Sequence, residues 1–83
     1  MGNTLPEKFT FGMAIQCLKD GHFVHRSGWN GRGMYLGLQT PNDKSANTLP
    51  YIYIITVEGN RVPWLASQTD MLADDWSITK IED

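Results

Sequence analysis

One predicted hairpin restricts the fold of this sequence more than any other feature. Tyr51 to Val57 reads YIYIITV, a run of aromatic and β-branched residues that favours a strand. The next four residues, Glu58 to Arg61, contain the pair Gly59-Asn60, which can supply the positive φ angles of a hairpin turn. Val62 to Leu65 would form the second strand of the hairpin. Because Pro63 lacks an amide hydrogen, this segment is predicted at a sheet edge or a strand end. The chain is therefore expected to contain an antiparallel sheet.

An amphipathic helix is predicted over residues 11–20. Its apolar stripe at positions i, i+3, i+4 and i+7 consists of Phe11, Ala14, Ile15 and Leu18. Thr10 can cap its first turn, and Gly21 fits a left-handed stop at its end. The stripe predicts a helix that covers one face of the sheet.

The remaining elements are shorter. A strand at 22–26, a glycine-rich turn at 27–33, a strand at 34–38, a long polar loop at 39–50 and a last strand at 76–81 are predicted. Ser67 to Asp70 resembles a capping box that opens a second helix, and this helix ends before Asp74 and Asp75, since acids are unfavourable at a helix C-terminus. The predicted fold class is α+β, a small antiparallel sheet packed by an N-terminal helix, with a short second helix near the C-terminus.

Size and charge limit the functional classes. Eighty-three residues form one domain, 1–83, in which 1–8 is expected to be a flexible polar leader. Folding buries only about 63% of the surface of so small a chain, which favours an oligomer. A net charge of −2 argues against a binder of DNA or RNA polymers. Without a membrane-length apolar run or an apolar signal segment, we expect a cytoplasmic protein that does not act at a membrane.

Catalytic and metal chemistry receive little support. His22 and His25 are three residues apart, which on a strand gives opposite faces. Cys17, the single cysteine, lies in the first helix without a clear base, and it excludes an intramolecular disulfide. The C-terminal aspartates lack the spacing of a calcium loop. We therefore predict no enzyme, no metal and no cofactor.

Ligand binding is favoured by Trp29, which stands within the turn Gly28 to Gly33. Glycines allow a ligand to approach the backbone closely, and Arg32 offers a fork for phosphate. Asn30-Gly31 also fits an ordinary hairpin turn, which leaves a turn without a ligand as the alternative. An exposed indole in this position is a stacking platform for a base or an anchor for a subunit.

A second cluster runs from Trp64 to Trp76. A tryptophan here precedes a predicted helix N-terminus, whose free amides favour a phosphate. Ser67, Gln68, Thr69 and Asp70 provide hydroxyl, amide and carboxylate groups for a ribose or a base edge. Asp75 is expected to accept hydrogen bonds, either from a ribose or from backbone amides of a neighbouring loop. The alternative for this cluster is a capped helix with tryptophans in the core.

The motifs GWNGRGMYLGL and PWLASQTDMLADDW, together with the preceding helix, resemble the phage Thoeris anti-defence protein two family over residues 11–78. The resemblance implies a homotetramer that binds a cyclic ADP-ribose isomer, a bacterial immune signal, in pockets between subunits and does not cleave it. Some relatives also bind cyclic dinucleotides of a second immune system at a separate site. The resemblance to this family places Trp29, Asn30 and the segment from Trp64 to Trp76 at the ligand pockets.

Combining both arguments, we predict the ligand-binding residues Arg26, Trp29, Asn30, Gly31, Arg32, Met34, Trp64, Ser67, Gln68, Thr69, Asp70, Asp75 and Trp76. Arg26, Arg32 or helix amides would supply the local positive charge for the phosphates. Two rival functions stay open: a protein-interaction module that inhibits a host protein through exposed tryptophans, and a small nucleotide hydrolase that uses Asp70 or Asp75.

Overall fold

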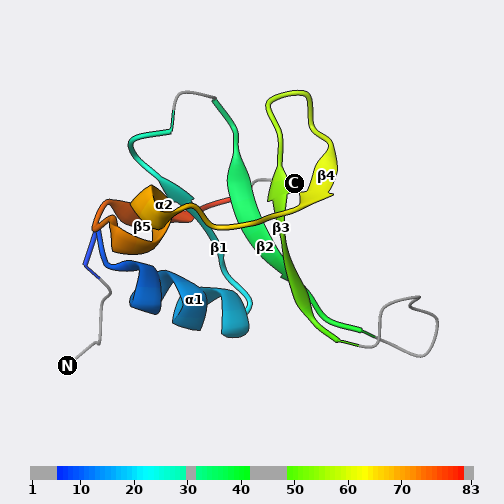
Figure 1. Cartoon of the computed structure of the whole chain (residues 1–83), viewed down its shortest axis with the longest axis horizontal. Coiled ribbons are helices and arrows are strands. Elements are labelled where there is room, and N and C mark those ends of the chain that lie inside the picture. The colour runs from blue at the N-terminus through cyan, green and yellow to red at the C-terminus, as the bar shows by residue number, and fades with distance from the viewer. Residues whose placement is uncertain (1–5, 30–31, 42–48, 82–83) are drawn as a thin grey trace.

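The computed structural model describes residues 6–29, 32–41 and 49–81. The elements in chain order are α1 (Phe11–Lys19), β1 (Phe23–Arg26), β2 (Tyr35–Gln39), β3 (Tyr51–Ile55), β4 (Arg61–Pro63), α2 (Gln68–Leu72) and β5 (Trp76–Thr79) (Figure 1). This arrangement confirms the predicted α+β class. Neither helix within these ranges has the length and apolar character needed to cross a membrane.

Helix α1 forms where its apolar stripe predicts it. The Thr10 hydroxyl accepts a hydrogen bond from the Met13 amide at 3.4 Å and caps the first turn. The helix ends before Gly21, whose φ of +95° is a left-handed conformation that glycine adopts without strain. Cys17 is buried beside Leu18 on the side that faces the sheet, as expected for a small apolar side chain.

The five strands form one antiparallel sheet in the order β4-β3-β2-β1-β5. The first four strands follow one another along the chain, whereas β5 returns after α2 and pairs with the free edge of β1. Phe9 then forms an antiparallel bridge with Trp76 at the outer edge of β5, with N···O distances of 2.9 and 3.1 Å. The chain is thus tied to the sheet from Phe9, the residue that follows the predicted leader.

The β3–β4 hairpin differs in detail from its prediction. β3 ends at Ile55, and the turn is closed by a hydrogen bond from the Gly59 amide to the Thr56 carbonyl at 2.8 Å. Gly59 alone adopts a positive φ, at +90°, so the expectation that Asn60 shares this conformation is wrong. The Asn60 amide instead donates to the Thr56 hydroxyl at 3.1 Å. Pro63 lies on the edge strand β4, as predicted.

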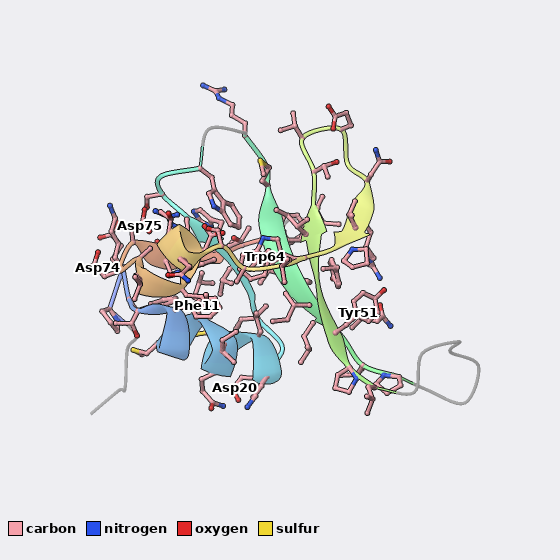
Figure 2. All side chains as sticks on the ribbon, viewed as in Figure 1. Phe11, Asp20, Tyr51, Trp64, Asp74 and Asp75 are labelled. Carbon is pink, nitrogen blue, oxygen red and sulfur yellow. The ribbon has the colours of Figure 1, made fainter. Side chains whose placement is uncertain are left out.

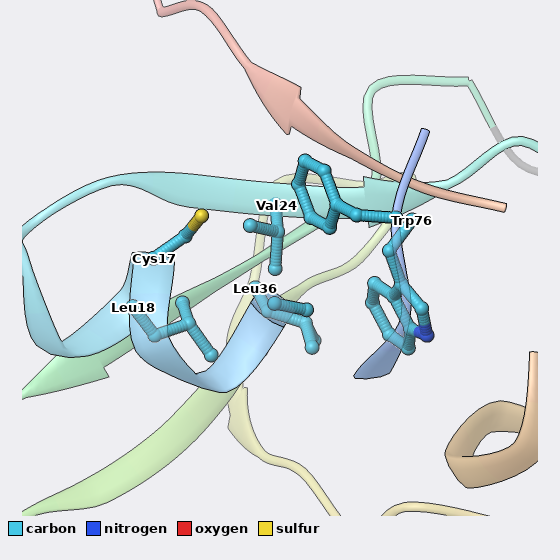
Figure 3. Packing of buried hydrophobic residues seen from close by; sticks show 7 residues of the cluster. Cys17, Leu18, Val24, Leu36 and Trp76 are labelled. Atoms are coloured by element: carbon cyan, nitrogen blue, oxygen red, sulfur yellow. The ribbon is translucent and has the colours of Figure 1, made fainter. Parts of the chain in front are cut away.

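One face of the sheet carries the core. Val24 is paired with Leu36 and with Ile78, so these side chains share the face that α1 covers. The buried cluster on this face contains Phe9, Ala14, Cys17, Leu18, Val24, Leu36 and Trp76 (Figure 3). The segment that joins β4 to α2 crosses the sheet on the same side (Figure 1). This core is small, in keeping with the chain length.

The opposite face is covered by its own side chains. Tyr53 is only 6% exposed because it lies across its strand partner Gly37, where a Cβ atom would collide with the Tyr53 ring and hydroxyl. The Arg61 guanidinium stacks on this ring, 4.1 Å from the centroid, and donates to the Gln39 side chain at 2.7 Å. Position 37 therefore requires glycine.

Candidate functional site

Four aromatic side chains from distant parts of the chain pack together beside α2. The ring centroid of Trp76 lies 5.5 Å from those of Phe11 and Trp29 and 6.1 Å from that of Trp64. The indole planes of Trp29 and Trp64 are inclined to that of Trp76 by 80° and 83°, the edge-to-face geometry that aromatic pairs prefer. We call Phe11, Trp29, Trp64 and Trp76 the aromatic cluster.

The members of the aromatic cluster differ in exposure. Trp76 is fully buried, so its indole offers no surface to a ligand, and it serves as the floor on which the others rest. Trp29 and Trp64 are half-buried and keep part of their surface in solvent. Figure 2 shows Trp64 and Phe11 directed to the same region between α1 and the crossing segment. The ring centroids of Phe11 and Trp64 are 6.2 Å apart, with the two rings tilted to each other. From the sequence, Phe11 is expected only as part of the apolar stripe of the helix.

Trp29, expected to be an exposed indole, is half-buried against the core. Its ring packs against Trp64 and Trp76, and its indole Nε1 donates to Asp70 Oδ1 at 3.3 Å. Its backbone amide also donates to the Arg26 carbonyl at 3.3 Å, which closes the turn after β1. The indole of Trp29 is therefore fixed on both its polar and its apolar side.

Arg26 joins two carboxylates that are distant in the sequence. Its Nη1 atom donates to Asp70 Oδ1 and its Nε atom to Asp75 Oδ1, each at 2.9 Å. These side chains are largely removed from solvent, with 16% of Arg26, 13% of Asp70 and 25% of Asp75 exposed. The hydrogen bonds that Arg26 donates to Asp75 and then to Asp70 raise the pKa of Arg26 above its already high value. The pairing connects β1 to α2 and to the segment that leads into β5.

Asp70 also holds the start of α2. Ser67 and Asp70 form the predicted capping box: the Asp70 amide donates to Ser67 Oγ at 3.1 Å, and the Ser67 amide donates to Asp70 Oδ2 at 3.2 Å. The Asp70 carbonyl accepts from Trp76 Nε1 at 3.0 Å. Burial acts to raise the pKa of Asp70, but the hydrogen bonds from Arg26, Ser67 and Trp29 outweigh it and lower the pKa below the ordinary value.

Asp75 accepts a hydrogen bond from a backbone amide of a neighbouring loop, one of the two kinds of partner expected from the sequence. Its Oδ2 atom accepts from the Gly28 amide at 2.9 Å, in the turn that carries Trp29, while Oδ1 accepts from Arg26. The hydrogen bond from Arg26 is the main reason that the pKa of Asp75 lies below its ordinary value. Asp75 thus fixes the glycine turn, and its exposed neighbour Asp74 points away at the end of α2 (Figure 2).

Two electrostatic expectations are not met. Arg26 does not supply free positive charge for a phosphate, because Asp70 and Asp75 leave the three-residue group with a formal charge of −1. A phosphate at the N-terminus of α2 is also unfavourable. This helix has five residues, and the amides of Ser67 and Asp70 are already used in the capping box. The site therefore favours an uncharged base or ribose over an anion.

The other predicted site residues lie around this centre. Gln68 and Thr69 are exposed in the first turn of α2, Arg32 is exposed in the glycine turn, and Met34 is half-buried before β2. Asn30 and Gly31 lie outside the described residues. Within the described ranges, no group of three or more histidine, cysteine, aspartate or glutamate side chains is placed to hold a metal ion.

Comparison with known proteins agrees with this pattern of residues. Residues 9–79 match the family model described as the Thoeris anti-defense 2-like domain. The chain is also 38% identical, over 85 residues, to a protein of Bacillus phage SP01 named Thoeris anti-defense 2. The match covers 86% of this chain and 94% of the phage protein.

Proposed function

This chain belongs to the Thoeris anti-defense 2-like family and has an anti-defence role, and from that premise we propose how it acts. It binds a cyclic ADP-ribose isomer, the immune signal, and sequesters it without cleaving it. Sequestration keeps the signal from its effector in the cytoplasm of the infected bacterium. The name of the relative in phage SP01 supports the anti-defence role.

The single observation that carries the proposal is the pair of half-buried indoles, Trp29 and Trp64, supported on the buried Trp76. Indoles held rigidly against a buried floor lose little conformational freedom when a base stacks on them. A stacked base contributes about 1–3 kcal/mol. The exposed polar groups of Gln68 and Thr69 lie in the adjacent helix, where they can donate to or accept from a ribose.

One chain alone provides too few contacts for a competitor of an immune effector. Nanomolar affinity corresponds to about −12 kcal/mol, several times the contribution of one stacked base. We therefore include in the proposal a homotetramer in which ligand pockets lie between subunits. Leu65, which precedes α2, and Leu72, its last residue, support this assembly, because 91% and 82% of their surface is exposed.

These leucines also favour the second candidate, a module that inhibits a host protein. Exposed apolar side chains around a tryptophan cluster are typical of protein-binding surfaces. This candidate predicts binding to a protein and no uptake of a nucleotide. It differs from the first proposal in ligand class, so one experiment can separate them.

Uptake and release of the signal test both candidates. The protein is incubated with the cyclic ADP-ribose isomer, freed from unbound ligand, and heated to release what it holds. A sequestering protein returns the ligand intact, a hydrolase returns product, and a protein-binding module returns nothing. Cyclic dinucleotides are tested in parallel by thermal shift, since a tight ligand raises the apparent stability by mass action. Release of product or absence of uptake would refute the proposal.

A further inference from the structure

A groove on the face of the sheet opposite the core carries the net positive charge that the surroundings of the aromatic cluster lack. It has a volume of about 550 Å³ and lies along the outer edge of the sheet, between the segment before Phe9 and the strands β1 and β5. The polar side chains that line it are Glu7, Lys8, His25, Ser27, Ser77 and Lys80. Its size is within the range of pockets for small ligands.

The sheet register explains why these residues meet. Phe9 and Trp76 form an antiparallel bridge, so the residues before Phe9 lie alongside the residues after Trp76. Lys8 and Lys80 therefore line the same groove, although they are far apart in the sequence. His25 and Ser77 are paired across β1 and β5, so both belong to the face opposite the core and form the floor.

The charges of the groove favour an anion. Two lysines against one glutamate give a formal charge of +1, whereas the group of Arg26 with its two aspartates carries −1. The hydroxyls of Ser27 and Ser77 add donors that suit phosphate oxygens. Burial lowers the pKa of His25 despite the opposing charge of Asp75, so the imidazole is mostly neutral at pH 7 and can serve as a donor without adding charge.

We propose that the groove formed by Lys8, Lys80, His25, Ser27 and Ser77 binds the diphosphate group of a nucleotide. The anionic part of the ligand then lies against the two lysines and not beside Arg26, whose guanidinium is already paired with Asp70 and Asp75, while Glu7 lowers the affinity. The anion chemistry follows from the groove alone. The identification of the nucleotide as the sequestered signal rests on the proposed function.

The first experiment uses inorganic pyrophosphate as the probe and does not depend on the proposed function. Amide chemical shifts of the full chain are followed during the titration, and the largest changes are expected at Ser27, Ser77 and Lys80. Lys8→Gln and Lys80→Gln should each weaken binding about threefold to tenfold. Glu7→Gln should strengthen it by about twofold to fivefold, because it removes a repulsive charge.

Lys19→Gln is the matched control, since Lys19 is an exposed lysine in the last turn of α1, outside the groove. An equal effect of all three lysine substitutions would show nonspecific attraction and overturn the proposal. So would shift changes confined to other regions, or an unchanged affinity in Glu7→Gln and both groove lysine variants. Circular dichroism of each variant checks that the fold is retained.

A second titration uses the cyclic ADP-ribose isomer and separates the two possible failures. If the wild type binds this ligand and the groove variants bind it equally well, the proposed function stands and the assignment of its diphosphate to the groove is refuted. If the wild type binds pyrophosphate in the groove but not the cyclic ligand, the groove is confirmed as an anion site and the proposed function is refuted.

Discussion

Asp75→Asn tests whether the carboxylate that joins Arg26 to the glycine turn is structural. In the wild type both carboxylate oxygens accept hydrogen bonds, one from Arg26 Nε and one from the Gly28 amide, each at 2.9 Å. An asparagine amide has one acceptor oxygen, and its NH₂ group must face a donor at the other position. The substitution therefore removes the charge and leaves one hydrogen bond unsatisfied.

The expected loss follows from these two contacts. A hydrogen bond to a charged group contributes about 1.5–3 kcal/mol, and exposure of a quarter of the Asp75 side chain favours the lower half of that range. We expect the free energy of unfolding to fall by about 1.5–2 kcal/mol at pH 7. For a domain of this size that corresponds to a decrease in Tm of roughly 6–16 °C.

The pH dependence gives a second, independent criterion. Because Arg26 lowers the pKa of Asp75, the carboxylate stabilises the fold above its unfolded-state pKa of about 3.9, and this stability is lost as the pH falls through the folded-state pKa. The difference between wild type and Asp75→Asn should be complete at pH 7 and shrink below about pH 4.

Urea denaturation from pH 7 to pH 2, at one fixed protein concentration, measures this difference. Asp74→Asn is the control, because Asp74 is exposed and takes part in none of the ion pairs among the described residues. A loss below about 0.5 kcal/mol at pH 7, the usual range for surface substitutions, would refute the structural role. So would a loss that is the same at pH 2.5 as at pH 7.

Three further predictions concern packing, binding and assembly. Gly37→Ala should lower the free energy of unfolding by about 1–3 kcal/mol, because its Cβ collides with Tyr53, whereas Gly12→Ala in α1 should raise it slightly; chemical denaturation compares the two. Trp29→Ala should weaken binding of the cyclic ligand by about 1–3 kcal/mol in calorimetric titration and also lower Tm, and unchanged affinity would make Trp29 purely structural. Light scattering should give about four times the 9.4 kDa chain mass, with a lower mass for Leu72→Gln, and a stable monomer at micromolar concentration would contradict the tetramer.

Local features of the fold could be predicted because their partners are close in the sequence. Thr10 caps a helix through a residue three positions later, and Ser67 pairs with Asp70 at the same spacing. Gly21 ends α1 through its own backbone conformation. Each of these signals is contained within one turn, so no knowledge of the tertiary structure is needed to recognise it.

The centre of the candidate site could not be predicted in the same way. Arg26 lies 44 residues from Asp70 and 49 from Asp75, and no local pattern indicates which charges will pair. The sequence pointed to Arg26 as a phosphate ligand because it resembles any basic residue near a glycine turn. Only the return of β5 to the edge of β1 brings both aspartates to it and changes the charge of the site.

The position of β5 also determines how the molecule opens. Strands β1 to β4 are joined by consecutive connections, whereas the contact between His25 and Thr79 closes a loop of more than 50 residues. Detaching β5 exposes one edge of β1, releases the Phe9 bridge and removes Trp76 from beneath the other indoles. These segments should therefore exchange their amide hydrogens together, as one cooperative unit. A ligand held by the indoles must then slow exchange along β5 as well, which couples occupancy of the site to closure of the sheet.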